Sequence, residues 1–186
     1  SEMCIRDSGW DACSGYYYED STINGFSHTH VSGTGCCDYG DVLLMPTVGE
    51  QRYQTTDPQS QQLAYSSAFS HENETAEPGY YSVFLDTYQV KAEISATKRG
   101  AIHRYTFPES SEAGFILDLD YSLQRQTNSD MGIEVISDTE ICGHKKTTYW
   151  AFDQYINFYA KFSKPFSYTL AVSYTHLRAH ETRHDL

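Results

Sequence analysis

The sequence lacks an apolar run of the roughly 20 residues that a membrane helix needs, and its basic residues are few. Lysine and arginine number 13 against 25 aspartates and glutamates, which gives a formal net charge of −12. An acid surplus of this size repels nucleic acid and anionic lipid surfaces. We therefore expect no nucleic acid and no membrane among the partners of this chain.

Cysteine is scarce as well. The five cysteines stand at positions 4, 13, 36, 37 and 142 and form no Cys-x-x-Cys pair. This spacing argues against a zinc ribbon and against a dense disulfide framework. It leaves open the redox state of Cys13, Cys36, Cys37 and Cys142.

Apolar residues are plentiful and follow a strand pattern. Hydrophobic residues make up 39% and aromatic residues 15% of the 186 residues, enough for the core of one domain. Apolar and polar residues alternate with a period of two, as in strands with one buried face, through residues 81–85, 90–97, 102–107, 115–121 and 156–162. A shorter strand is expected at 133–136, and residues 58–68 suit a short helix or a loop. We predict an all-β chain, an antiparallel β-sandwich.

The two ends differ from this middle. His176, His180 and His184 are spaced by four and would share one face of a metal-binding helix. Both ends, however, resemble peptides that arise when sequencing-library adaptor is translated as coding DNA. We expect residues 1–8 and 172–186 to be artefact tails, and residues 9–171 to be an incomplete native domain.

Residues 23–41 are the densest in polar chemistry, combining glycines, hydroxyls, two histidines and two aspartates. Glycine allows close backbone approach and small polar residues supply hydrogen bonds, which suits the wall of a sugar pocket. A zinc site would also fit, with ligands from His28, His30, Cys36, Cys37 and Asp38. A cysteine nucleophile activated by a histidine would also fit. A buried turn with satisfied hydrogen bonds would fit as well. No lysine follows the glycines, which disfavours a phosphate-binding loop.

The same region carries a resemblance to a known family. The motif Gly-Phe-Ser-His-Thr-His is followed by Ser-Gly-Thr-Gly, and further motifs are colinear with them, at residues 25–30, 32–35, 38–41, 69–74, 77–81, 103–108, 150–154 and 162–166. Together they resemble the N-terminal domain of bacterial α-mannosidases of glycoside hydrolase family 92, over about residues 10 to 170.

The resemblance implies an exo-acting, inverting, Ca²⁺-dependent enzyme that removes terminal α-mannose from glycans. It implies an N-terminal β-sandwich of the galactose-mutarotase type (a supersandwich) and a C-terminal helical toroid, with the active site between them. An inverting glycosidase uses one carboxylic acid and one carboxylate, and in this family both belong to the C-terminal domain, with most calcium ligands. That domain would be missing here. The family is typically exported to the periplasm or cell surface, or secreted.

On this resemblance the chain supplies one wall of the mannose pocket and no catalytic residue or metal site of its own. The expected substrate-binding residues are His28, His30, Gly33, Thr34, Gly35 and Asp38. Asp41 and residues 71–74 are weaker candidates, the latter also fitting a solvated acidic loop. Arg104 is expected to be a partnered structural charge, and Asp153 and Gln154 near Trp150 a domain contact.

Two further functions fit the sequence. The first is a stand-alone carbohydrate-binding β-sandwich without hydrolase activity, which would present aromatic platforms. The second is mutarotase-type proton transfer, in which His28 or His103 works with Glu72 in one cleft. A fragment of a larger enzyme would instead expose an apolar patch where the missing domain docks.

Overall fold

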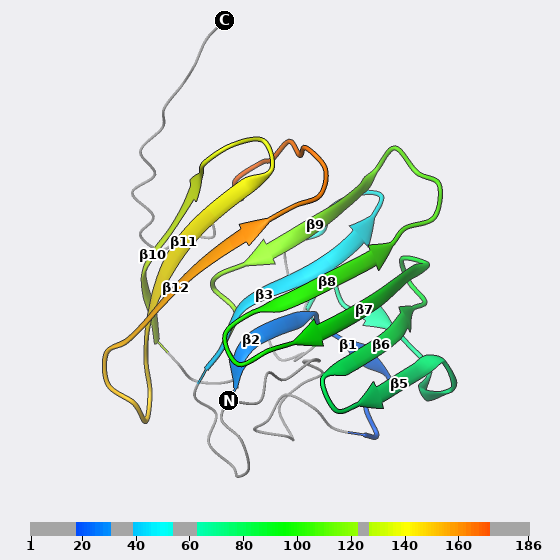
Figure 1. The fold of residues 1–186 in the computed structure, drawn as a ribbon, viewed down its shortest axis with the longest axis horizontal. Coiled ribbons are helices and arrows are strands. Elements are labelled where there is room, and N and C mark those ends of the chain that lie inside the picture. The colour runs from blue at the N-terminus through cyan, green and yellow to red at the C-terminus, as the bar shows by residue number, and fades with distance from the viewer. Residues whose placement is uncertain (1–17, 31–38, 54–62, 123–126, 172–186) are drawn as a thin grey trace, which may run out of the picture. The chain divides into compact units, whose positions relative to one another are not determined.

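The structure is a computed structural model that describes residues 18–30, 39–53, 63–122 and 127–171 (Figure 1). The chain divides into two compact units, residues 1–126 and residues 127–186. Within the described ranges it is built of antiparallel β-strands and one short 3-10 helix. No helix in these ranges has the length and apolar character to cross a bilayer. The prediction of an all-β sandwich is confirmed.

The described residues of the first unit form three antiparallel sheets. One has the order β2-β3-β9, the second β5-β6-β7-β8, and the third is the short pair β1-β4. The elements are β1 (Thr22–Ile23), β2 (Phe26–His30), β3 (Tyr39–Val48), β4 (Ser67–Ala68), η1 (His71–Asn73), β5 (Glu74–Glu77), β6 (Tyr80–Leu85), β7 (Val90–Ala96), β8 (Ala101–Thr106) and β9 (Ala113–Asp118).

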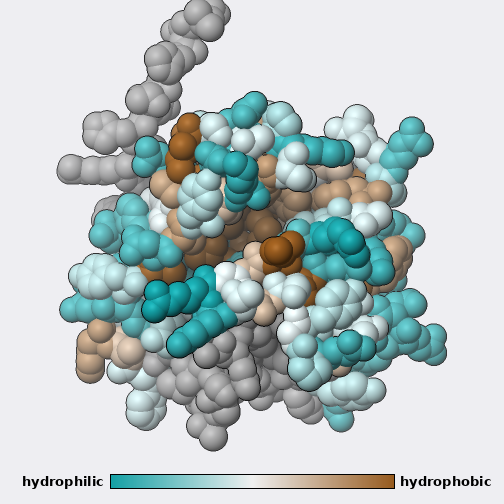
Figure 2. Space-filling model, in the orientation of Figure 1, coloured by the Kyte–Doolittle hydropathy of each residue, from teal (hydrophilic) through white to brown (hydrophobic). Residues whose placement is uncertain are grey.

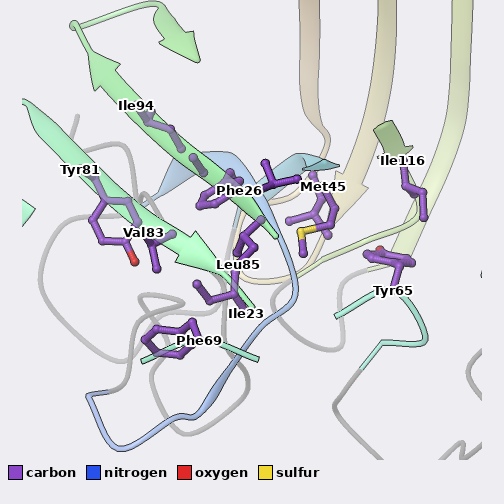
Figure 3. Close-up of a cluster of buried hydrophobic side chains, with 13 residues drawn as sticks. Ile23, Phe26, Met45, Tyr65, Phe69, Tyr81, Val83, Leu85, Ile94 and Ile116 are labelled. Carbon is purple, nitrogen blue, oxygen red and sulfur yellow. The ribbon is translucent and has the colours of Figure 1, made fainter. Parts of the chain in front are cut away.

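The core of the first unit lies between its sheets. Alternation along β7 buries Val90, Ala92 and Ile94, while Lys91 and Ser95 face solvent. Side chains from both larger sheets join one cluster of buried apolar residues. Figure 3 shows this cluster, which consists of Ile23, Phe26, Leu43, Met45, Tyr65, Phe69, Tyr81, Val83, Leu85, Val90, Ala92, Ile94 and Ile116. The period-two pattern in the sequence therefore marks the faces that the sheets bury against each other.

The predicted strand at residues 115–121 is shifted in the structure. The strand β9 begins at Ala113 and ends at Asp118, so the last part of the prediction is wrong. The reason is a turn in which Asp118 Oδ1 accepts hydrogen bonds from the backbone N–H groups of Asp120 and Tyr121, at 2.8 and 3.0 Å. An aspartate that bonds the backbone two residues on competes with the sheet ladder and ends the strand.

In the second unit, residues 127–171 are described and contain a three-stranded antiparallel sheet with the order β10-β11-β12. Its strands are β10 (Thr127–Val135), β11 (Glu140–Thr148) and β12 (Gln154–Lys161). The predicted strands at 133–136 and 156–162 lie in β10 and β12, whereas β11 is not predicted by the alternation. Gly143 of β11 sits under the Phe158 ring, where an added Cβ would lie 2.5 Å from Phe158 Cε1. Glycine at this position lets the ring of the neighbouring strand pack on the backbone.

Candidate functional site

The described parts of the predicted sugar-binding segment lie largely on β2 and β3, which pair antiparallel and are called the β2–β3 hairpin. Phe26 pairs with Leu44 and His28 pairs with Asp41, with a shift in register between the two pairs. Two residues along β2 are therefore matched by three along β3, which is the pattern of a β-bulge. The extra residue lies at Val42 or Leu43, directly opposite Ser27.

The bulge holds Val42 in an unusual backbone conformation. Its φ is 58°, in the left-handed region that valine rarely adopts because of its branched side chain. Thr29 and Tyr39 of the same hairpin also have positive φ, at 64° and 76°. Such conformations persist only where the surrounding structure fixes them.

The His28 side chain is one of the groups that hold the hairpin backbone in this conformation. Its Nδ1 lies 2.9 Å from the carbonyl oxygen of Val42. A bulge leaves backbone groups outside the sheet ladder, and here the His28 Nδ1–H satisfies the Val42 carbonyl. His28 thus bonds to the backbone of its own hairpin.

The Nε2 edge of the His28 ring faces the second large sheet. His28 Nε2 lies 3.2 Å from Nε2 of His103 on β8, and the two ring planes differ by 19°. The Tyr105 hydroxyl lies 2.7 Å from His103 Nδ1. Three side chains, His28, His103 and Tyr105, therefore connect the hairpin to β8 through one row of hydrogen bonds.

All three groups of this row are neutral near pH 7. Burial lowers the pKa of His28, although its bond to the Val42 carbonyl acts in the opposite direction. Burial, together with the neighbouring His28, lowers the pKa of His103 to about 3. Burial also raises the pKa of Tyr105 well above 10. A buried charge here would lack compensation, so each group keeps its uncharged form.

A carboxylate lies at the base of the same hairpin. Asp41 is fully buried, and its Oδ2 accepts a hydrogen bond of 3.3 Å from the Thr29 hydroxyl. The Thr29 hydroxyl also contacts the His28 carbonyl oxygen. Asp41 was a weaker candidate from the sequence, and its burial beneath Thr29 makes it part of the hairpin's internal bonding.

The structure places only part of the predicted pocket. His28 points inward with both ring nitrogens bonded, and His30 ends β2 opposite Tyr39. Gly33, Thr34, Gly35 and Asp38 lie outside the described residues, as do Cys36 and Cys37 of the zinc-site and nucleophile hypotheses. Within the described ranges, no group of three or more His, Cys, Asp or Glu side chains is placed to hold a metal ion.

Residues 71–74 form a packed turn beside Tyr18 and Tyr81. His71 Nδ1 lies 2.5 Å from Glu74 Oε2, and the His71 ring stacks on Tyr18 with 4.2 Å between ring centroids. The Tyr81 hydroxyl donates to Glu74 Oε1 at 2.6 Å, while Glu72 is exposed. The solvated-loop interpretation therefore suits Glu72 but does not suit the bonded pair of His71 and Glu74.

Sequence patterns gave no role to Tyr105 and indicated His103 only as a partner for Glu72. In the structure the hydrogen-bond partners of His103 are His28 and Tyr105, and those of His28 are Val42 and His103. The available signal was alternation in residues 102–107, which puts His103 and Tyr105 on the inner face of β8. That pattern gives the face but not the partner.

The β11–β12 hairpin holds the segment predicted as a domain contact. Lys146 Nζ donates to Asp153 Oδ1 at 2.6 Å and lies 5.2 Å from the centroid of the Tyr155 ring. Trp150 is 73% and Phe152 is 84% exposed, whereas Gln154 is buried. A contact with another domain stays a prediction.

A family model covers nearly the whole chain. The model of the glycosyl hydrolase family 92 N-terminal domain matches residues 3–185. The chain belongs to glycosyl hydrolase family 92. The family resemblance of its motifs is thereby confirmed, and no match was found among curated proteins.

Solved structures of family 92 members share the fold. The family 92 α-mannosidase of Bacteroides thetaiotaomicron, solved in complex with mannoimidazole, is 38% identical with a TM-score of 0.75, over 86% of this chain. The family 92 glycosyl hydrolase ccman5 is 27% identical with a TM-score of 0.62, over 83% of this chain. In both cases the match covers 21% of the solved chain, so the family 92 domain described here spans about a fifth of these relatives.

Proposed function

We propose that this chain is the N-terminal part of an exo-acting α-mannosidase that removes terminal α-mannose from glycans. The observation that carries the proposal is the 38% identity, with a TM-score of 0.75, to the family 92 α-mannosidase of Bacteroides thetaiotaomicron. In this proposal the β2–β3 hairpin forms one wall of the mannose pocket. The residues that contact the sugar or shape its pocket are His30, Gly33, Thr34, Gly35 and Asp38.

His28 has a different part in the proposed pocket. Both of its ring nitrogens bond inside the protein, to Val42 and His103. It therefore shapes the wall by holding the hairpin from beneath, and it keeps no free ring nitrogen for a sugar hydroxyl.

The chemical step is assigned to the part of the enzyme beyond this domain. Inversion needs a carboxylic acid to protonate the leaving oxygen and a carboxylate to activate water, about 6.5–9.5 Å apart. We place both, and the ligands of the Ca²⁺ ion, mainly in a C-terminal domain. Calcium suits sugar hydroxyls as a hard ion with oxygen ligands. Among the described residues, no group of three or more His, Cys, Asp or Glu side chains is placed to hold the ion.

The surface of the second unit supports a partner domain. Among the described residues, its exposed large hydrophobic side chains are Ile133, Ile136, Trp150, Phe152, Tyr155, Tyr159, Tyr168 and Leu170. In Figure 2 hydrophobic residues are interspersed among hydrophilic ones on the face shown. Two of these side chains, Trp150 and Phe152, are 73% and 84% exposed and stand two positions apart, which suits a contact with another domain.

A stand-alone sugar-binding domain is the second candidate. The exposed rings of Trp150 and Phe152 favour it, because sugar-binding modules use aromatic side chains as platforms. The same rings suit a docking surface, so a direct test must separate the two functions.

The test starts from the source DNA. Amplification from a primer within the codons for residues 100–160, read past Ala171, gives the continuing frame, which is then expressed beside the 186-residue chain. We expect the longer product to hydrolyse 4-nitrophenyl α-D-mannopyranoside, to release β-mannose first by NMR, and to lose activity with EDTA. The shorter chain should show no hydrolysis. A frame that ends after Leu186, with mannose binding and no hydrolysis, would favour the sugar-binding domain instead.

A further inference from the structure

We propose that His103 and Tyr105 are positioning residues for the β2–β3 hairpin. They lock the His28 ring in the one tautomer whose Nδ1 proton holds the Val42 carbonyl, and so fix the left-handed bulge. In the proposed α-mannosidase this hairpin is the pocket wall, so the effect on the sugar rests on the proposed function. The hydrogen-bonded row itself does not depend on the proposed function.

The first step concerns the carbonyl of Val42. It accepts from a side chain, and an Nδ1 atom can donate to a carbonyl only when it carries a proton. A neutral imidazole has one N–H, so His28 Nε2 is then an acceptor. The bond to Val42 is therefore possible only in the tautomer of His28 that is protonated at Nδ1.

The second step follows across the sheets. Because His28 Nε2 accepts, the Nε2 atom of His103, 3.2 Å away, must carry the proton. His103 Nδ1 is then an acceptor, and the Tyr105 hydroxyl at 2.7 Å donates to it. The row therefore has one consistent proton arrangement while its members are neutral, running from Tyr105 through His103 and His28 to Val42.

The third step concerns what the row achieves. Val42 at φ 58° is strained, and a valine would leave this conformation if the carbonyl lost its partner. A complete buried network specifies one conformation, whereas a broken one leaves costly unpaired groups. Phe26 packs its ring edge against His103 with 6.5 Å between centroids, which holds the ring in place. Residues on β8 thereby help to fix the backbone conformation of β3 at Val42.

The first experiment reads the tautomers directly. Long-range ¹H–¹⁵N spectra of the ¹⁵N-histidine-labelled 186-residue chain, assigned with His→Gln variants, should show His28 protonated at Nδ1 and His103 protonated at Nε2. Tyr105→Phe removes only the hydroxyl donor to His103 Nδ1, so the alternative tautomers of both rings should become measurably populated. Tyr80→Phe is the matched control, because its hydroxyl bonds Glu93 on the outer face of the same sheet.

Several outcomes would overturn the inference. His28 protonated at Nε2, mixed tautomers in the unchanged chain, or spectra of Tyr105→Phe identical to the parent would each do so. If the chain alone gives no dispersed spectrum, the same spectra are recorded on the longer reading frame.

The second experiment separates the inference from the proposed function. In the longer enzyme, Tyr105→Phe should raise KM for the mannoside about three- to tenfold with a smaller change in kcat. Expected tautomers without any hydrolysis by the parent would uphold the row and reject the mannosidase. Hydrolysis with unchanged KM in Tyr105→Phe would uphold the mannosidase and reject the positioning role.

Discussion

Arg104 of β8 binds both carboxylate oxygens of Glu93 on the neighbouring strand β7. Its Nε donates to Oε2 at 2.8 Å and its Nη2 donates to Oε1 at 2.7 Å. The two residues are cross-strand partners on the outer face of the sheet, where the Tyr80 hydroxyl donates to the same carboxylate at 2.9 Å. The sequence-based prediction that Arg104 is a partnered structural charge is confirmed.

This contact predicts an acid-sensitive step in stability. The hydrogen bond from Arg104, with that from Tyr80, lowers the pKa of Glu93 from 4.5 to about 2. The unfolded chain binds this proton at higher pH than the folded one, so the stabilisation is present above pH 4.5 and disappears as the pH falls towards 2. Urea unfolding at several pH values should show that Glu93→Gln flattens this part of the profile. Glu77→Gln, an exposed change on β5, is the control, and an unchanged slope in Glu93→Gln would contradict the prediction.

The histidine row predicts a second loss of stability on acidification, in a higher pH range than that of Glu93. His103 has a folded pKa of about 3 against an ordinary value of 6.5. The unfolded chain therefore takes up a proton first, and stability falls as the pH drops from 6.5 towards 3, by about 2 kcal/mol at pH 5. His103→Gln should remove this fall between pH 6.5 and 5 while leaving the acid step of Glu93 below pH 4.5. A parent protein equally stable at pH 7 and pH 5 would refute the prediction.

Gly25, just before β2, should not tolerate a side chain. Its φ is +155°, and an added Cβ would lie 2.9 Å from Leu43 Cγ and 3.1 Å from the Leu44 carbonyl oxygen. We expect Gly25→Ala to lower the free energy of unfolding by about 2 kcal/mol, since overpacking of this kind costs that much. At Gly100 the nearest atom would be 3.8 Å away, so Gly100→Ala is the control and should change stability little. Thermal unfolding of both variants, monitored by far-UV circular dichroism, checks the prediction. Equal melting temperatures for the two variants would argue against this packing.

Val42 and Val83 should respond differently to glycine. Both are buried, but only Val42 has a positive φ, of 58°. Both substitutions lose burial and raise the chain entropy of the unfolded state. At Val42 the relief of about 1–3 kcal/mol of strain offsets these losses, whereas nothing offsets them at Val83. Denaturant titrations should therefore show a change within about 1 kcal/mol for Val42→Gly and a loss of about 3 kcal/mol for Val83→Gly. A loss at Val42 as large as that at Val83 would mean that the bulge carries no strain.

Trp150 and Phe152 should matter for assembly rather than for stability. They are 73% and 84% exposed, and exposed substitutions usually change stability by less than about 0.5 kcal/mol. The double variant Trp150→Ser/Phe152→Ser should unfold like the parent but dissociate more readily from the remainder of the enzyme supplied as a separate chain. Tyr53→Ser, an exposed aromatic of the first unit, is the control. Undiminished association of the double variant, measured by calorimetry, would exclude this surface as the docking site.

The sequence by itself determined much of the strand structure and the family. Alternation along β6, β7 and β8 is local, because successive side chains of a strand point to opposite faces whatever surrounds them. The Gly-Phe-Ser-His-Thr-His motif and its colinear partners determined membership of family 92, which the family model confirms. Local alternation also gave the inner face of β8, on which His103 and Tyr105 lie.

Only the tertiary structure decided what these inner residues do. His28 and His103 are 75 positions apart, and no periodicity relates two strands of different sheets. The bulge at Val42 depends on the register between β2 and β3, and the end of β9 depends on the Asp118 turn, neither of which alternation encodes. A histidine in the motif suggested a group for sugar hydroxyls. The packing of the two sheets decided the partners of this ring, because a buried imidazole must find partners for both nitrogens and these lay on β3 and β8.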